Sequence, residues 1–378
     1  MNKKTIERAK KEKVLVTGGA GFIGGHLVDK LLEEGYSVRV LDNLAPPTHN
    51  GKLPDWFNKK AEFLKGDVRN KNDWIKALKG VSYVFHLASY MDFHHDFSTY
   101  IDTNAKSTAL AYEVIVEKKY PVKKIIVASS QSVYGEGTYK CAKDGLVFPS
   151  PRSEAQLKSG EWEMKCSIDG SLLTPIAQKE NDPLRPTIPY GISKKTSDEL
   201  LFCLGRLYGI PSVALRYTIV HGARQSFRHF YSGALRQIAV MALSGEDIVL
   251  HEDGRQLRDY VNVRDVVDAH LVVLKSPKAD FEPFNVGSGK ATRVHELAET
   301  ILKEAGVSAT IRTPGLYRLG APRHSPSDSS KLRALGWKPT RTLADGVREY
   351  LAWIKQFPEA KKFLSETLRS MKEKKLLR

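Results

Sequence analysis

Tyr190 and Lys194 stand four residues apart in the stretch PYGISKK, so on a helix their side chains would lie one above the other. An ammonium group beside a phenol favours the phenolate and lowers the pKa of the phenol from its usual value of about 10. A tyrosine tuned in this way can serve as a general base near neutral pH. The same spacing is common on ordinary surface helices, so its meaning depends on what surrounds it.

Hydroxyl groups follow an apolar run in the stretch ASSQSVYG, residues 128–135. Ser130 ends the predicted strand, and Gln131 and Ser132 come next. Neither glutamine nor serine acts as a proton acid or base near neutral pH. This stretch therefore offers hydrogen bonds to a reacting oxygen but no carboxylic acid.

Glycines are spaced three apart after the first predicted strand, at Gly18, Gly21 and Gly24 in TGGAGFIGGHL. A strand, spaced glycines and a helix let backbone amides approach a pyrophosphate at the helix N-terminus. The next strand ends in Asp42, eighteen residues beyond Gly24, where a carboxylate can take both ribose hydroxyls of an adenosine. Because that carboxylate repels a 2′-phosphate, the pattern favours NAD over NADP. Asp67 in GDVRN is either an adenine contact or a turn-capping aspartate.

Alternating strands and helices must position these residues. The apolar runs KVLVT, SVRVLD, YVFHLA and KKIIVASS alternate with helical patterns through GGHLVDKLLEEG, NDWIKALKG and NAKSTALAYEVIVEKK. Such alternation predicts an α/β fold, with a doubly wound, mainly parallel sheet covered by helices on both faces. Further strands are expected in PSVALRYTIV and EPFNVGSG, and amphipathic helices over 292–306 and 343–356.

Residues 136–186 interrupt this pattern, because they are rich in Gly, Pro, Lys and Ser and show little periodicity. We interpret them as a long insertion, and loops of such length are usually functional. Cys141 and Asp144 stand in one turn and Cys166 and Asp169 in a similar one, at about the spacing of paired zinc knuckles. Structural zinc sites prefer Cys and His, so this set predicts a hairpin lid without metal, with a weak zinc site as the alternative.

The composition is that of a globular protein: 378 residues, 41% hydrophobic and 27% charged. Three cysteines are too few for a disulfide framework, and Cys203, in the apolar stretch ELLFCLGRLYG, is expected in the core. No apolar run approaches the roughly 20 residues of a membrane helix, and the start does not resemble a signal peptide, so we expect a cytoplasmic protein without membrane contact. The net charge of +16 is scattered, without an aromatic-interleaved basic repeat, which favours an anionic small molecule over nucleic acid.

These motifs together resemble the extended short-chain dehydrogenases/reductases, in particular the NAD-dependent nucleotide-sugar epimerase/dehydratase family and its UDP-galactose 4-epimerase-like members. The resemblance runs from Val14 to about Leu351. The motifs that carry it are HLAS, SSQSVYG, YGISK, LRYTIVHGARQ, the expected strand RDYVNVRDVVDAH, FNVGSG and DSSKLRALGW. The insertion is similar to that of dTDP-L-rhamnose 4-epimerase-like members, which have a more complete set of knuckle cysteines and histidine.

The resemblance implies a Rossmann NAD-binding domain over 1–220, to which 258–290 return. A smaller substrate domain would comprise 221–257 and 291–378, with the site in the cleft between them. His94 and His95 would follow the HLAS strand, in a loop that either lines the sugar pocket or is simply exposed.

Roles for single residues follow from the same resemblance. Tyr190 would be the base, Lys194 its partner, and Ser130 the hydroxyl that bonds the reacting sugar oxygen. Ser132 would bind substrate, and Arg258 and Arg318 would grip its diphosphate, with solvated arginines as the alternative. The implied NAD-binding residues are Gly18, Gly21, Phe22, Ile23, Gly24, Asp42, Asn43, Asp67, Val68, Leu87, Ala88, Tyr190 and Lys194.

The choice of reaction depends on Gln131 and Ser132. In the 4,6-dehydratases of this family an Asp–Glu pair follows the hydroxyl, and decarboxylating members keep the glutamate. Without these acids, the sequence predicts an NAD-dependent epimerase that inverts C4 of a nucleoside-diphosphate sugar. The alternatives are a net oxidoreductase or dehydratase, or a non-catalytic binding protein. In this family the helices corresponding to NAKSTALAYEVIVEKK and TSDELLFCLGRLYG pair across a two-fold axis, so a homodimer is expected.

Overall fold

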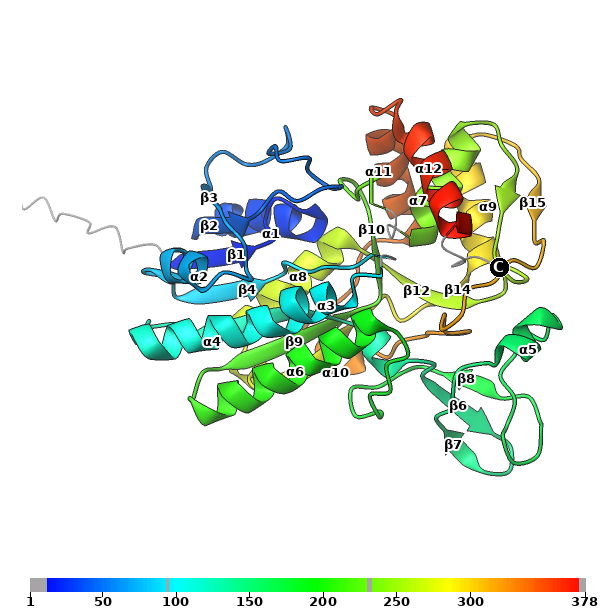
Figure 1. Ribbon diagram of the computed structural model, residues 1–378, viewed down its shortest axis with the longest axis horizontal. Helices are drawn as coiled ribbons and strands as arrows, with labels where there is room; N and C mark the ends of the chain where they lie inside the picture. Colours follow the sequence, from blue (N-terminus) through cyan, green and yellow to red (C-terminus); the bar gives the residue numbers. More distant parts are fainter. Residues whose placement is uncertain (1–11, 93–94, 230–232, 374–378) are drawn as a thin grey trace, which may run out of the picture.

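A seven-stranded parallel sheet forms the centre of the computed structural model, which describes residues 12–92, 95–229 and 233–373 (Figure 1). The strand order is β13-β9-β5-β4-β1-β2-β3, and it reverses between β1 and β4. In such sheets ligands bind outside the carboxyl ends of the strands at the point of reversal. The strands are β1 (Lys13–Thr17), β2 (Ser37–Asp42), β3 (Glu62–Lys65), β4 (Tyr83–His86), β5 (Lys124–Ser130), β9 (Ser212–Tyr217) and β13 (Glu282–Val286).

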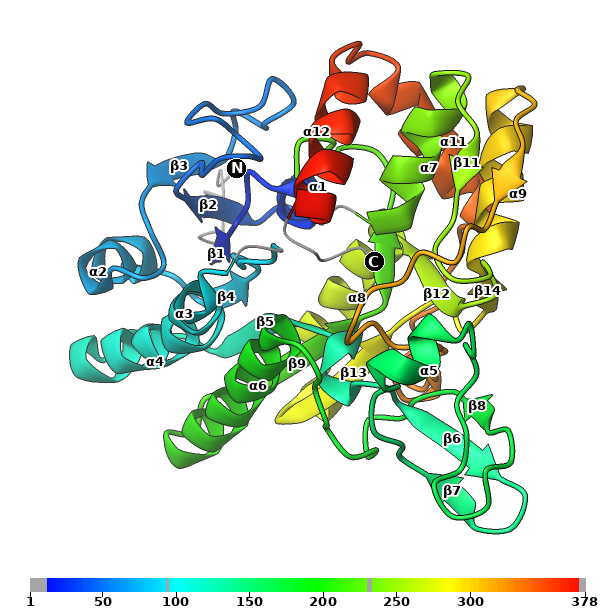
Figure 2. The same ribbon diagram turned by 45° about the vertical axis from the view of Figure 1, so that its right-hand side comes forward.

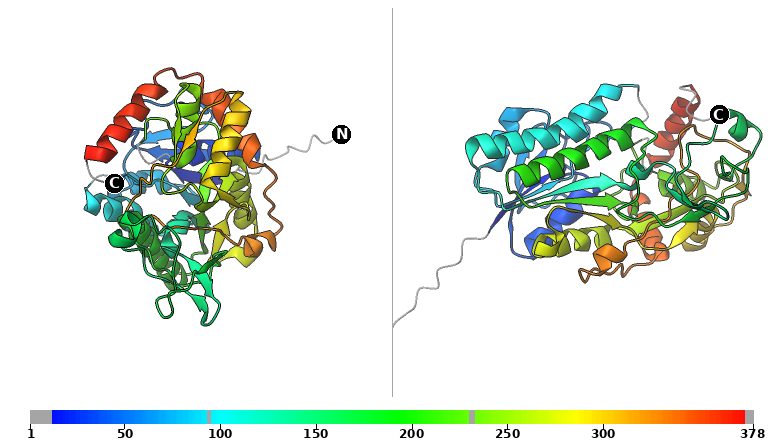
Figure 3. Two further views of the ribbon diagram at one scale, coloured as in Figure 1. Left: turned by 90° about the vertical axis from the view of Figure 1, so that its right-hand side faces the viewer. Right: turned by 90° about the horizontal axis from the view of Figure 1, so that it is seen from below.

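Helices cover both faces of this sheet, which confirms the predicted doubly wound α/β fold. Helices α1 (Phe22–Glu33) and α8 (Val263–Lys275) pack on one face, and α4 (Ser107–Lys118) and α6 (Pro189–Leu207) lie side by side on the other (Figure 3, right). Helix α2 (Lys71–Leu78) packs against α4. Strands buried on both faces become continuous apolar runs, and all but the last residue of β5 are buried.

The C-terminal part has a hydrophobic core of its own, around α7, α9 and α11 (Figure 2). A three-stranded sheet, β10-β12-β14, and a two-stranded sheet, β11-β15, belong to this part. The helices predicted over 292–306 and 343–356 are confirmed as α9 and α11. The elements are β10 (Ile219–His221), α7 (Gly233–Leu243), β11 (Ile248–Val249), β12 (Leu257–Asn262), β14 (Ala291–Arg293), α9 (Val294–Ala305), β15 (Ile311–Arg312), α11 (Leu343–Ile354) and α12 (Ala360–Glu373).

Two expected strands differ in the structure. PSVALRYTIV divides at Thr218 into β9, in the large sheet, and β10, in the small one. The backbone N–H of Thr218 still donates to Val286 O of β13 at 3.0 Å, but the chain then leaves to pair with β12. RDYVNVRDVVDAH is a strand only as far as Asn262, whose side chain accepts from the N–H of Arg264 and caps α8.

The insertion folds around its own three-stranded antiparallel sheet, in the order β7-β6-β8 (Figure 2). Its elements are β6 (Thr138–Cys141), β7 (Gly145–Val147), α5 (Glu154–Lys158) and β8 (Thr174–Ile176). A small core of Tyr139, Cys141, Met164, Cys166 and Leu173 holds it together. The shorter helical segments are α3 (Phe97–Tyr100), the π-helix η1 (Ile101–Lys106), the 3₁₀ turn η3 (Pro277–Ala279) and α10 (Ser330–Arg333). Among the described residues, no helix is both long and apolar enough to cross a membrane.

Candidate active site

The glycine-rich turn between β1 and α1 is packed too closely to accept side chains. Gly18 has φ +70°, and a Cβ there would lie 2.8 Å from the backbone nitrogen of Ala88. A Cβ at Gly24 would lie 2.2 Å from Gly18 O, so the first turn of α1 packs directly on the loop. Gly21 caps α1 with extended backbone, and the first turn of α1 carries no acidic residue. The positive end of the helix is therefore suited to the pyrophosphate of NAD.

Asp42 ends β2 beside this turn, in the position expected of a ribose ligand. One carboxylate oxygen accepts from the N–H of Ala20 at 3.1 Å and the other from the N–H of Leu44 at 2.9 Å. Each oxygen keeps one further lone pair, which can take a ribose hydroxyl. Phe22 and Ile23 open α1 and are half-buried. The residues present at this turn thus fit NAD.

Asn43 and Asp67 meet next to Asp42, because Asn43 Nδ2 donates to Asp67 Oδ2 at 3.2 Å. The Asp67 carboxylate also accepts from the backbone N–H and the guanidinium of Arg69, at 2.6–2.9 Å. Burial acts to raise the pKa of Asp67, but the hydrogen bonds from Arg69 outweigh it and lower the pKa to about 2. Asp67 therefore does cap its turn, and its contact with adenine stays a prediction. The Val68 side chain is buried in the core below.

Leu87 and Ala88 follow β4 and lie against the glycine turn. Their N–H groups donate to the carbonyl and the hydroxyl of Thr17, at 3.2 and 3.1 Å. The Thr17 hydroxyl lies 2.7 Å from His86 Nδ1, and His86 Nε2 lies 2.7 Å from Ser107 Oγ. Burial lowers the pKa of His86 to about 3, so its ring is neutral. These contacts fix the ends of β1 and β4 where the strand order reverses.

Helix α6 places Tyr190 and Lys194 on one face, as their spacing predicted. Lys194 Nζ lies 5.9 Å from the centre of the Tyr190 ring and donates to Ala128 O of β5 at 2.7 Å. Burial lowers the pKa of Lys194 to about 8, against an opposite effect of the charge on Asp198. An ammonium group in this place favours the Tyr190 phenolate.

Ser130 lies at the start of the 3₁₀ turn η2 (Gln131–Tyr134), immediately after β5. Its Oγ accepts from the N–H and the hydroxyl of Ser132, at 3.1 and 3.0 Å. A Cβ at Gly191, the residue after Tyr190, would lie 2.5 Å from Ser132 O, so the start of α6 packs directly on this turn. Gln131 Oε1 is buried and has no hydrogen-bond partner among the described residues. The turn thus gathers hydroxyls and an amide against the start of α6, and it carries no acid.

Asp198 is a residue of this site that sequence reasoning missed. It lies one turn beyond Lys194 on the same face of α6, and its Oδ2 accepts from Arg216 Nε at 3.0 Å. Both side chains are buried, and Arg216 also donates to Tyr134 Oη at 3.0 Å. The repeated spacing of four from Tyr190 was the available signal, but the partner on β9 was not visible in it.

Arg258 and Arg318 come from separate segments of the C-terminal part. Nη1 of Arg258 donates to the carbonyls of Leu257 and Arg323 at 2.8 and 2.9 Å, and Nη2 donates to Pro322 O at 2.8 Å. Burial lowers the pKa of Arg258, with a smaller contribution from the charge of Arg318, which lies nearby. The two guanidinium groups are therefore in one region, and Arg258 is a half-buried arginine that is anchored on backbone carbonyls.

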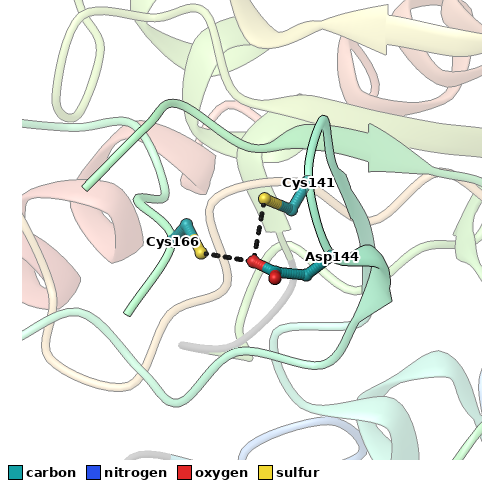
Figure 4. Close-up of side chains that lie close together, drawn as sticks. All are labelled: Cys141, Asp144 and Cys166. Carbon is teal, nitrogen blue, oxygen red and sulfur yellow. Dashed lines mark hydrogen bonds between the residues drawn. The ribbon is translucent and has the colours of Figure 1, made fainter. Parts of the chain in front are cut away.

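The insertion brings together three of the four residues in its paired turns (Figure 4). The thiols of Cys141 and Cys166 both donate to Asp144 Oδ2, at 3.2 and 3.3 Å. The Asp169 carboxylate is instead engaged by Ser171, whose hydroxyl donates at 2.7 Å, and by an exposed lysine. The group has the donor atoms of a metal site but is hydrogen-bonded within itself.

Cys203 corrects one expectation, because it is exposed and not in the core. Helix α6 turns Lys194, Asp198 and Leu201 inward, and Cys203 lies on the opposite side. The stretch is apolar on both sides of the helix, so composition alone does not reveal which side is buried. His95 is exposed, and His94 lies outside the described residues.

Comparisons with known proteins give the same picture. The model of the NAD dependent epimerase/dehydratase family matches residues 14–154 and 167–287. A dTDP-L-rhamnose 4-epimerase of Burkholderia thailandensis is 32% identical over 352 residues, which cover 91% of this chain and 95% of the relative.

Solved structures agree with this match. The UDP-glucose 4-epimerase of Thermotoga maritima with UDP-glucose is 31% identical, with a TM-score of 0.72, over 91% of this chain and 99% of its own. The UDP-glucose 4-epimerase of Thermus thermophilus in complex with NAD is 28% identical, with a TM-score of 0.71 and the same coverage. The chain belongs to the NAD dependent epimerase/dehydratase family and is an NAD-dependent enzyme.

Proposed function

We propose that the enzyme inverts C4 of a nucleoside-diphosphate sugar through a transient 4-keto sugar, without net oxidation or reduction. Tyr190 takes the proton of the C4 hydroxyl and later returns one, and Ser130 holds the reacting oxygen by a hydrogen bond. The ammonium group of Lys194, on the same face of α6, favours the phenolate form of Tyr190. NAD, when bound at the glycine turn, supplies the acceptor and donor of hydride. Arg258 and Arg318 bind the diphosphate, which anchors the sugar while it turns over.

The turn after β5 is the observation that carries this choice of reaction. Elimination across C5 and C6 needs an acid and a base beside the sugar, and residues 131 and 132 supply an amide and a hydroxyl. The Ser132 hydroxyl donates to Ser130 Oγ at 3.0 Å. The two serine hydroxyls therefore form a hydrogen-bonded pair that can bind a sugar oxygen but cannot act as an acid or base near neutral pH. A dehydratase is therefore not favoured, and the relatives with the higher identities described above are named 4-epimerases of dTDP-L-rhamnose and UDP-glucose.

The wider assignments belong to the same proposal. We assign residues 1–220 with 258–290 to the NAD domain, and 221–257 with 291–378 to the substrate domain. Within the returning segment, β12 with Arg258 pairs with strands of the C-terminal part, and α8 and β13 join the large sheet and its helices. The chain works as a homodimer in the cytoplasm, in agreement with its free cysteines, and takes an anionic nucleotide sugar rather than nucleic acid.

The decisive experiment is product analysis by NMR with UDP- and dTDP-linked hexoses. An inverted C4 with no release of reduced cofactor supports the proposal, whereas a 4-keto-6-deoxy product or stoichiometric NADH refutes it. Tyr190→Phe removes the base and should lower turnover about a hundredfold or more. Tyr208→Phe, at the exposed end of the same helix, is the matched control and should keep wild-type turnover.

A further inference from the structure

Glu252 lies at the centre of a buried ion network that joins the insertion to the C-terminal part. The residue is 4% exposed, and its two oxygens accept from Nη2 and Nη1 of Arg152 at 2.9 and 3.0 Å. One of them also accepts from Nη1 of Arg323 at 2.8 Å. Arg152 belongs to the insertion, so segments far apart in the sequence share a single carboxylate.

Arg323 has two further acidic partners. Both oxygens of Asp253 accept from it, at 2.8 and 2.9 Å, and Glu163 of the insertion accepts at 2.6 Å. The other oxygen of Glu163 lies 2.9 Å from His324 Nε2. A guanidinium that is 0% exposed is tolerated because its charge is compensated and its N–H groups are bonded. Removing one partner of such a network leaves a buried charge uncompensated, so its geometry is closely determined.

The loop 321–323 lies between the insertion and Arg258. From the insertion, Arg152 Nη2 donates to the carbonyl of residue 321, and Glu136 accepts from the N–H of residue 323, both at 3.0 Å. From the other side, Arg258 donates to the carbonyls of residues 322 and 323, at 2.8 and 2.9 Å. A displacement of this loop therefore moves the acceptors that orient the Arg258 guanidinium.

We propose that Arg152, paired with Glu252, is a positioning residue for Arg258, so that the insertion sets the geometry in which the diphosphate is bound. The inference rests on the proposed function, because it takes Arg258 to bind a nucleoside diphosphate. Three of the five N–H groups of Arg258 are used by backbone carbonyls, and the other two have no hydrogen-bond partner in the described part of the chain, so they are open to phosphate oxygens. Guanidinium–phosphate bonding is directional, so the loop decides where these two groups point.

Arg152→Met tests this role, because it keeps the length of the side chain and removes its hydrogen bonds to Glu252, Trp162 and Ala321. We expect the Kd for UDP and dTDP to rise about tenfold, equivalent to about 1.4 kcal/mol, and KM for the nucleotide sugar to rise with it. We expect kcat to stay within about twofold and NAD content to be unchanged. Hydrogen exchange of the backbone amides in 321–325 should become faster in the same variant.

Lys165→Met is the matched control, since it removes an exposed ion pair with Glu161 from the same insertion and should change none of these quantities. Arg152→Lys keeps the positive charge but cannot donate to both oxygens of Glu252, so it should bind UDP with intermediate affinity. This variant replaces Arg152→Met in the test if the methionine variant does not fold. A folded Arg152 variant with wild-type affinity for UDP and dTDP would overturn the positioning role, as would a loss of kcat and NAD with unchanged Kd. A wild-type protein that binds neither nucleotide would instead overturn the proposed function, and the role of Arg258 with it.

Discussion

The ammonium group of Lys194 is buried, 5.9 Å from the ring centre of the candidate base Tyr190. The side chain is 3% exposed and donates to a backbone carbonyl, Ala128 O. Burial, and to a smaller extent the charge of Lys194, lower the pKa of the nearby His86 to about 3, so that ring is neutral. The positive charge is therefore directed at Tyr190, at a cost in stability that should depend on pH.

Lys194→Met measures this cost. The pKa of Lys194 is lowered to about 8 in the folded protein, so between pH 8 and about 10.5 the unfolded chain binds more protons. Wild-type stability then gains up to about 3 kcal/mol as the pH rises through this window. We expect the free energy of unfolding of Lys194→Met, relative to wild type, to be highest at pH 7 and to fall by this amount toward pH 10.5.

Urea unfolding at pH 7, 8.5 and 10 checks this, with wild type and variant at the same NAD content. Lys195→Met is the control, because its side chain is only half-buried and forms an ion pair with Glu199 at 3.7 Å. A difference between wild type and Lys194→Met that does not change with pH would contradict the prediction.

At the scale of elements, ion pairs join the insertion to the rest of the chain, and hydrogen bonds from two thiols stabilise its own hairpin. Cys141 and Cys166 share Asp144 Oδ2 as acceptor, which describes two protonated thiols around one carboxylate. The sheet of the insertion and its small hydrophobic core surround this group. The hairpin therefore has means of support that do not involve a metal, and the larger domains bury cores of their own.

Chelation should accordingly leave the fold intact. We expect treatment with EDTA and a thiol-compatible zinc chelator to change Tm by less than about 2 °C, and elemental analysis to find less than one zinc per chain. The double variant Cys141→Ser/Cys166→Ser keeps a donor to Asp144 at each position. It should lose stability only because serine is smaller and more polar than cysteine at these buried positions, by about 1–3 kcal/mol. Cys203→Ser, on the exposed side of α6, is the control. Stoichiometric zinc together with a lower Tm after chelation would show the prediction to be wrong.

At the scale of the whole molecule, α4 and α6 lie side by side on one face of the large sheet (Figure 3, right). Apolar side chains on α6 and just before α4 are exposed there. Leu207 and Ile192 of α6 are 68% and 48% exposed, and Ile101, in the helical segment before α4, is 43% exposed. Large exposed apolar side chains of this kind are typical of interaction surfaces. A second copy of the chain would bury them by pairing the same two helices across a two-fold axis, as a C₂ interface requires.

Light scattering at micromolar concentration should therefore give twice the chain mass of 42.3 kDa. Leu207→Glu places a charge at the exposed end of α6, within the predicted interface, and should shift the protein toward the monomer. Leu146→Glu, at a 61% exposed position on the insertion, is the control and should remain dimeric. A wild-type protein of one chain mass would refute the homodimer.

The sequence by itself determined those features that depend on residues close together in the chain. The glycines before α1, Asp42 at the end of β2 and the spacing of Tyr190 and Lys194 all act within one strand–helix unit, so their placement follows from local periodicity. The strand and helix alternation likewise determined the doubly wound sheet, because parallel strands need covering helices.

Only the tertiary structure decided which partners distant segments would find. The local sequence pattern does not predict that Arg152 pairs with Glu252, a hundred residues away. It also does not predict that Arg258 donates three of its N–H groups to backbone carbonyls. The exposed side of Cys203 was likewise decided by packing, because α6 is apolar on both sides and a neighbouring sheet covers only one. Side-chain partners of this kind depend on the relative placement of whole elements, which periodicity along the chain does not encode.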